Sequence, residues 1–134
     1  MSHENVEIVR RGFLQPGPLV DTARVSPDAE FDFTDVYPDQ PVLRGAEAMR
    51  RFRDGGPWGD SIHFEPERFF DVDDERVLVF VHATSTGQTS GAAVESRIAH
   101  EVTIRDGWIV RVKVYRDRAR ALRAVGLPDQ ATSQ

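Results

Sequence analysis

Apolar residues recur at helical spacing in the first fourteen positions and at strand spacing through most of the second half of the chain. Val6, Val9 and Phe13 lie three or four residues apart, which predicts an amphipathic helix over residues 3–14. Ser2 has the side chain of a helix cap, and the acidic residues of the first turn suit the positive end of the helix.

Two further helices are predicted. Apolar residues at helical spacing favour one over residues 45–53, and the glycines and proline of 55–57 end it. The other spans residues 118–125 and ends at Gly126, with Pro128 just beyond.

Strands are predicted where apolar and polar positions alternate or where an apolar run is short. In residues 29–35, Phe31 and Phe33 share one face and polar side chains take the other. Residues 61–70 form a second strand, but Pro66 interrupts it and predicts a bend or an edge position. The remaining predicted strands span residues 76–86, 92–105 and 108–115.

Helices early in the chain and strands late favour an α+β class over alternating βαβ units. A bent antiparallel sheet wrapped around the N-terminal helix, with a short C-terminal helix, would leave a cone-shaped cavity. A length of 134 residues corresponds to one domain. We place it at residues 1–127 and expect residues 128–134 to be frayed.

The Asp-Gly turn at residues 106–107 joins the last two strands, and its type decides which side chains face the interior. A two-residue loop would pair Arg105 with Trp108. A type I turn with a glycine bulge would instead pair Ile104 with Trp108. We favour the second register because it gives one apolar and one polar face. It places His100 on the apolar face, opposite a valine.

Composition excludes several functional classes. A net charge of −5 argues against a general nucleic-acid binder. The absence of cysteine excludes disulfides, zinc–thiolate sites and a cysteine nucleophile. No apolar run approaches the ~20 residues of a transmembrane helix, and the N-terminus lacks the apolar region of a signal peptide, so we expect a cytoplasmic protein with no membrane partner. No glycine-rich phosphate loop is present, and no cofactor is expected.

Three sequence blocks together resemble the SnoaL-like branch of the NTF2-like superfamily: ENVEIVRRGF, VLRGAEAMRRF and IAHEVTIRDGWIVRVKVYRD. The resemblance covers residues 4–125. It implies a conical α+β fold, a homodimer and an apolar pocket between helices and sheet. The superfamily includes polyketide cyclases, ketosteroid isomerases, epoxide hydrolases and members without a known reaction, so the fold alone does not fix the function.

The chain departs from the catalytic members of this superfamily at two positions. Ketosteroid isomerases place an oxyanion-binding tyrosine late in the first helix, where this chain has Gly12 and Phe13. SnoaL-type cyclases carry an acidic residue late in the final strand, where Val114 stands. The isomerase base follows the first strand, and the nearest carboxylates here are Asp32 and Asp35.

His100 and Asp35 are the candidate catalytic residues. His100 is a polar residue on an apolar strand face, either a buried histidine held by one hydrogen bond or a pocket residue suited to proton transfer. Asp35 shares parity with the two phenylalanines before it, and a carboxylate against aromatic walls would have a raised pKa. The alternative is that Asp35 is an ordinary turn residue.

Further residues are predicted to line the pocket. Tyr37 and Trp58 lie in loops, where they either cap the pocket or fill a loop core. If the hairpin that joins the strands over 76–86 and 92–105 centres near residue 90, His82 falls opposite Ile98 and diagonal to His100. No third ligand has suitable spacing, so no metal site is expected. The full predicted lining is Phe31, Phe33, Tyr37, Trp58, Phe80, His82 and Val112.

The other face of the last two strands is predicted to carry charge. The favoured register sets Glu101 opposite Arg111, an opposite-charge cross-strand pair, with Arg97 and Tyr115 on the same face. The resemblance implies that this face forms a dimer interface. The alternative is a solvated charged surface.

Three functions compete. The first is cofactor-independent acid–base catalysis on an apolar metabolite, with Asp35 as base and His100 polarising the substrate oxygen. The second is a non-catalytic module that binds an apolar ligand. The third is an interaction protein whose dimer surface is its function. An apolar small molecule is the expected partner in the first two.

Overall fold

The computed structural model describes residues 2–14, 24–36, 39, 42–45, 47–48, 63–86 and 93–128. Its described elements are, in chain order, α1 (Ser2–Leu14), β1 (Val25–Asp32), β2 (Leu43–Arg44), β3 (His63–Asp71), β4 (Arg76–Thr86), β5 (Ala93–Arg105), β6 (Trp108–Tyr115) and α4 (Arg118–Val125).

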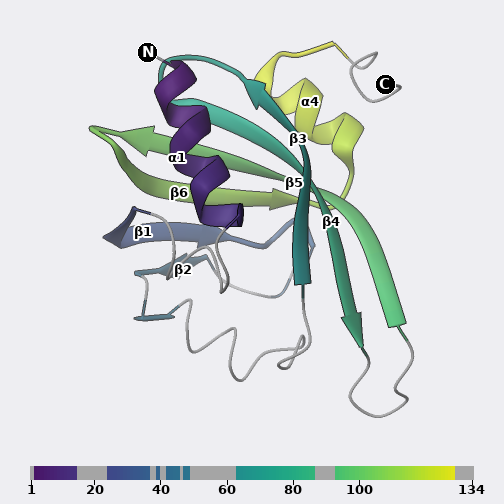
Figure 1. Ribbon diagram of the computed structural model, residues 1–134. Helices are drawn as coiled ribbons and strands as arrows, with labels where there is room; N and C mark the ends of the chain where they lie inside the picture. The colour runs from purple at the N-terminus through teal and green to yellow at the C-terminus, as the bar shows by residue number, and fades with distance from the viewer. Residues whose placement is uncertain are drawn as a thin grey trace.

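The strands form one mixed sheet in the order β2-β1-β6-β5-β4-β3. Neighbouring strands are antiparallel except β1 and β6, which run parallel and align Phe31 with Val112. The α+β class is confirmed, but the prediction of an antiparallel sheet is wrong for this pair of strands. The long strands curve as they pass α1 (Figure 1). Pairing between strands far apart in the chain has no local sequence signal, so the parallel pair was not predicted.

The sheet has an apolar core on each face. On the first face, Val6 and Val9 of α1 pack with alternate residues of β4, β5 and β6 and with the two phenylalanines at the end of β1. On the second face, Ala121, Leu122 and Val125 of α4 pack on β4 and β5. Figure 1 shows α1 in purple crossing the sheet and α4 in yellow beyond the end of β6. The central strands are therefore covered from both sides.

The β5–β6 turn is a two-residue loop. Asp106 and Gly107 both have positive φ, 53° and 80°, and Arg105 pairs with Trp108. Positive φ at both central positions defines a type I′ turn, whose twist matches that of the flanking strands. The register favoured from the sequence is therefore wrong at the turn.

A second irregularity restores the pattern of the two faces. The β5–β6 ladder shifts by one residue between Thr103 and Ile104, as a β-bulge produces. Beyond the shift, His100 faces Val114 instead of Val112. The predicted face of His100 is nevertheless correct, because Ile98 and Val102, which lie two residues before and after it on β5, belong to the core on the α1 side.

The first strand ends earlier than predicted. β1 stops at Asp32, and residues 34–36 form a turn. The Asp32 carboxylate accepts hydrogen bonds from the backbone N–H and the hydroxyl of Thr34 at 2.9 and 2.6 Å. This local bonding competes with strand pairing and turns the chain. Asp35 is therefore a turn residue, the alternative that the sequence left open.

Most other predicted boundaries are close to those observed. The strand over 61–70 is β3, an edge strand whose register shifts after Pro66, as the proline predicted. Of the predicted helix over 45–53, residues 47–48 are helical, and its other described residue, Gly45, precedes them. The rest of that helix and the predicted frayed tail beyond residue 128 lie outside the described residues.

Helix α4 is capped at both ends. The Asp117 carboxylate accepts hydrogen bonds from the N–H groups of Ala119 and Arg120 at 2.8 and 3.4 Å. Gly126 follows in the left-handed conformation at φ 83°, and the N–H of Leu127 bonds to the Leu122 carbonyl at 2.8 Å. These bonds satisfy backbone groups that a helix end leaves unpaired.

Replacing Gly126 tests the importance of this C-cap. A Cβ at Gly126 would meet no heavy atom of the described residues within 4 Å, so the penalty comes from φ alone. We expect Gly126→Ala to lower the free energy of unfolding by about 1 kcal/mol. Gly126→Asn should lose less, because asparagine tolerates this conformation. Urea unfolding of both variants measures the difference, and equal losses would contradict the explanation.

Candidate functional site

His100 lies near the middle of the apolar sheet face that α1 covers. Its Cα partners are Val79 of β4 and Val114 of β6, two residues of the core on that face. The Phe64 ring meets the imidazole edge-on, with centroids 5.5 Å apart. Only 6 % of the His100 surface is exposed. The sequence prediction of a histidine on the apolar face is confirmed.

Burial determines the charge of this imidazole. Desolvation lowers the pKa of His100 from 6.5 to about 4, because an apolar environment disfavours the cation. The ring is therefore neutral near pH 7. A neutral imidazole has one donor nitrogen and one acceptor nitrogen, so it can bind a polar group of either kind.

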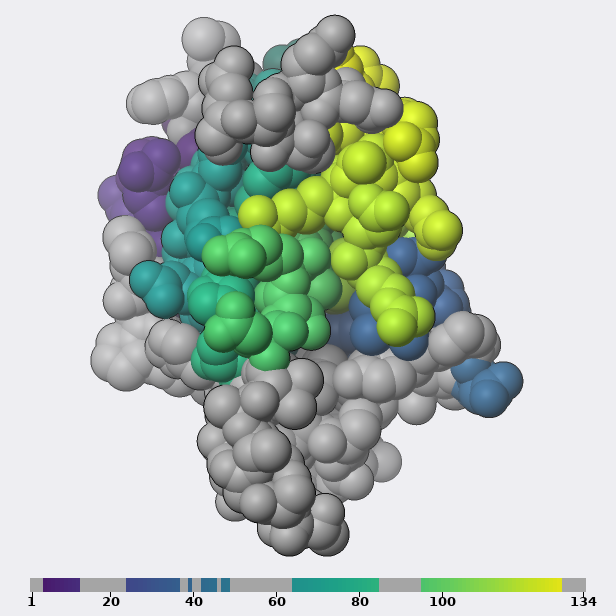
Figure 2. All heavy atoms as spheres, turned by 90° about the vertical axis from the view of Figure 1, so that its right-hand side faces the viewer, coloured from purple at the N-terminus to yellow at the C-terminus, as the bar shows by residue number. Residues whose placement is uncertain are grey.

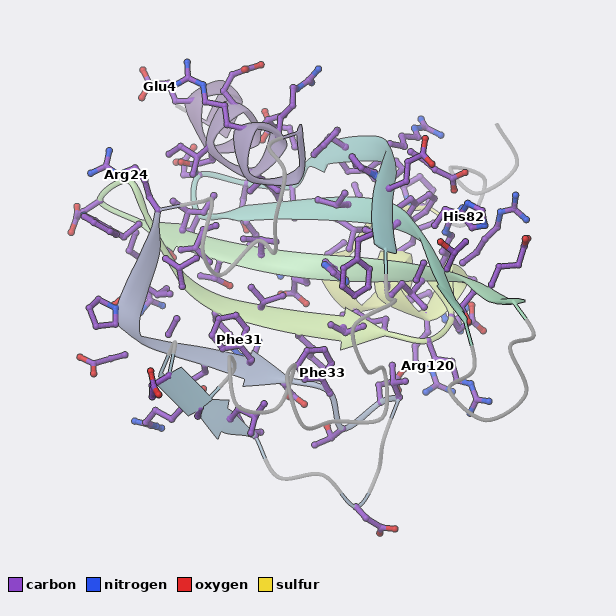
Figure 3. All side chains as sticks on the ribbon, turned by 60° about the horizontal axis from the view of Figure 1, so that its bottom comes forward. Glu4, Arg24, Phe31, Phe33, His82 and Arg120 are labelled. Carbon is purple, nitrogen blue, oxygen red and sulfur yellow. The ribbon has the colours of Figure 1, made fainter. Side chains whose placement is uncertain are left out.

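Three of the predicted lining residues lie on the same face as His100. Phe31, Phe33 and Val112 belong to the α1-side core, and the first and last of them are adjacent across β1 and β6. In Figure 3 the two labelled phenylalanine rings project from the same side of the chain at the end of β1. Their role as the lining of a ligand pocket stays a prediction.

Asp35 does not have the raised pKa that the sequence suggested. Burial would raise it, but hydrogen bonds from the Arg116 backbone N–H at 2.8 Å and from the Arg120 guanidinium outweigh burial, and the pKa of Asp35 lies below its ordinary value. A carboxylate stabilised as the anion is a weaker base. These contacts join the turn after β1 to the start of α4.

Phe80 and His82 lie on the opposite face from His100, so the predicted two-histidine pocket is wrong. Val81 is the residue that pairs with Ile98, and His82 pairs with Arg97. Adjacent strand residues point to opposite faces, so a shift of one position moves the side chain across the sheet. Figure 3 shows His82 far from the two labelled phenylalanines. Phe80 belongs to the core beneath α4.

Tyr37 and Trp58 lie outside the described residues, so their predicted roles are unchanged. Within the residues that the structure describes, no group of three histidine, cysteine or acidic side chains is placed to hold a metal ion.

The charged face of β5 and β6 contains a buried pair that the sequence did not predict. The Tyr115 hydroxyl donates to Glu101 Oε1 at 2.9 Å, and Arg76 lies 3.6 Å from the other oxygen of that carboxylate. Burial and the adjacent carboxylate raise the pKa of Tyr115. Glu101 pairs with Lys113, not with Arg111.

Part of this face is therefore not a solvated surface. Only 8 % of Glu101 and 6 % of Tyr115 is exposed within a single chain. Tyr115 belongs to the apolar cluster that α4 completes. Strand alternation predicted that both residues lie on one face, but it did not predict that α4 packs on that face.

Solved structures place this fold in a defined class. A protein from Jannaschia sp. CCS1, named as a candidate SnoaL-like polyketide cyclase, is 20% identical over 94% of both chains, with a TM-score of 0.66. An NTF2-like protein from Burkholderia xenovorans LB400 is 23% identical over 93% of this chain and 98% of its own, with a TM-score of 0.65. TerC, crystallised with polyporic acid, is 17% identical over 92% and 98%, with a TM-score of 0.68. The fold is NTF2-like.

Residues 22–112 match the family model of the SnoaL-like domain. The chain belongs to the SnoaL-like family, as the three sequence blocks indicated. None of the curated protein sequences matches it. None of the described helices is both long and apolar enough to cross a membrane.

The lowered pKa of His100 predicts how stability depends on pH. The unfolded state protonates this residue below its ordinary pKa of 6.5, whereas the folded state does so only near 4. The contribution of neutral His100 to the free energy of unfolding is therefore complete above pH 6.5, and it is lost as the pH falls toward 4. The total loss is about 3 kcal/mol. Urea unfolding at a series of pH values should show this loss, and His100→Leu should reduce it.

An NMR titration of the His100 ring provides the direct measurement. Its carbon shifts should stay at their neutral values down to about pH 5. A midpoint near 6.5 would contradict the desolvation that burial implies.

Proposed function

We propose that this protein binds an apolar small molecule between α1 and the sheet, and that His100 contacts a polar atom of that ligand. The observation that carries the proposal is a buried imidazole on an otherwise apolar face. Ligand pockets combine apolar walls with a few polar groups that orient the ligand.

The aromatic side chains on this face suggest the ligand class. Phe31 and Phe33 lie in the same core as His100's strand partners, and Phe64 meets the His100 ring. Aromatic rings favour stacked or edge-on contacts with other rings. Two of the structural neighbours are a candidate polyketide cyclase and a protein crystallised with polyporic acid. These observations support a ligand with aromatic rings.

Binding without chemistry is the form of the proposal that the site supports best. Where ketosteroid isomerases carry the oxyanion-binding tyrosine, this chain has Gly12 and Phe13. Where SnoaL-type cyclases carry the acidic residue, it has Val114. Asp35, the predicted base, is held as an anion by two hydrogen bonds from the start of α4.

A catalytic alternative uses His100 alone. Its neutral form can polarise a ligand oxygen or accept a proton, as cofactor-independent isomerases and cyclases require. In either case the homodimer implied by the family resemblance is part of the proposal.

Native mass spectrometry of the purified protein, followed by solvent extraction, tests the function. We expect an apolar compound at about one per chain in a ligand site of this kind. His100→Leu keeps the site apolar but removes the polar contact, and it should reduce the bound fraction. His82→Leu, which changes the histidine on the other face, is the matched control and should retain the ligand.

The outcomes separate the alternatives. Recovery of an unchanged ligand after incubation supports binding, and conversion to a product supports catalysis. Equal loss of ligand in the two histidine variants would contradict the assignment of the site to the α1 side. A wild-type protein that neither carries nor takes up apolar ligands would overturn the proposal.

A further inference from the structure

An arginine-rich cleft opens at the start of α4, on a part of the molecule that the proposed ligand site does not use. Its volume is about 480 Å³, and its lining is Arg97, Arg116, Asp117, Arg118 and Arg120. Figure 2 faces this region, with α4 in yellow beside the exposed part of β5 in green and the end of the β1 segment in blue. The cleft contrasts with the chain as a whole, whose net charge is −5.

Two of the four arginines are fixed by carboxylates. Arg118 donates a hydrogen bond to Glu67, and Arg120 donates one to Asp35. Asp117, the carboxylate among the lining residues, accepts hydrogen bonds from backbone N–H groups as the helix cap. Each of the three carboxylates therefore already has hydrogen-bond donors.

The other two arginines form no hydrogen bond to a carboxylate of the described residues. Arg97 lies 4.0 Å from Glu67, which already binds Arg118, and the Arg97 side chain is 62% exposed. Arg116 is exposed and forms no ion pair with the described residues. Among the described residues, four guanidinium groups therefore lie beside three carboxylates, a surplus of one positive charge, and Arg97 and Arg116 are the two that form no hydrogen bond to a carboxylate.

The wall of the cleft is held in place by the fold. The Arg118 guanidinium lies over the Phe80 ring, 4.7 Å from its centroid. It also donates to the carbonyls of Ile98 and Val81 at 3.3 and 3.1 Å. Arg118 therefore provides a positive wall that is already in place when a ligand arrives.

We propose that this cleft binds a small molecule that carries a multiply charged oxyanion, either phosphate or clustered carboxylates. Arg97 and Arg116 supply the direct contacts, and Arg118 and Arg120 form the positive wall. Guanidinium groups bind such oxyanions through paired hydrogen bonds. The cleft volume lies in the range of small-molecule sites, about 300–1,000 Å³.

Titration with inorganic phosphate and, separately, with citrate tests this site at constant ionic strength. The readout is the NMR shift of arginine side-chain N–H groups. We expect saturable shifts confined to the cleft arginines for at least one of the two anions. The anion that binds more tightly identifies the phosphate or the carboxylate form of the ligand.

Variants with matched charge make the test specific. The double variant Arg97→Gln and Arg116→Gln should weaken binding at least about 10-fold. Its control is Arg24→Gln with Arg105→Gln, which removes the same charge beside the distant β5–β6 turn. The control should change the dissociation constant less than about 2-fold, since exposed charges at that distance are largely screened.

Three results would overturn the proposal. The first is a linear, non-saturating response to both anions, and the second is an equal loss of binding in the two double variants. The third is a saturable site that maps away from the cleft. Thermal unfolding of each variant checks the fold, and because the four substituted side chains are exposed, we expect transitions close to wild type.

Discussion

The central strands β4 and β5 are buried on both faces, and this constraint governs where each polar side chain of the sheet can lie. Val77, Val79 and Val81 pack toward α1, whereas Leu78 and Phe80 pack toward α4. Every residue in the middle of these strands therefore points into a core. A polar residue there must become neutral or find a partner, because an unpaired charge in an apolar environment is costly.

Two consecutive residues of β5 satisfy this requirement in different ways. His100 points toward α1 and remains neutral, since burial lowers its pKa to about 4. Glu101 points the other way and is hydrogen-bonded by Tyr115, with Arg76 nearby. Glu101 therefore meets the requirement through Tyr115 and Arg76, whereas His100 meets it as a neutral ring among the apolar residues on the α1 side. The candidate site is assigned to the His100 side because the imidazole is the polar group on that apolar face.

Local sequence patterns predicted the elements of the second half of the chain well. The strands over 76–86 and 108–115 and the helix over 118–125 have the predicted bounds. The face of His100 was also predicted, although the register was not, because a bulge offset the different turn. The alternation of apolar residues therefore predicts the sheet face of a side chain more reliably than the turn sequence predicts its cross-strand partner.

Features that depend on distant segments were beyond the sequence. The parallel pairing of β1 with β6 and the packing of α4 on the second face have no local signal. The same holds for Asp35, whose chemistry is set by Arg116 and Arg120, more than eighty residues later. Its parity with Phe33 predicted a shared face, but the turn that follows Asp32 breaks that parity.

The turn after β1 connects the two faces of the molecule mechanically. Phe33 packs in the core on the α1 side, and Asp35, two residues further on, holds the first turn of α4. A displacement of the aromatic ring that shifts this turn also shifts the carboxylate that anchors Arg120. The three-residue segment from Phe33 to Asp35 therefore links the geometry of the arginine cleft to the packing around the Phe33 ring.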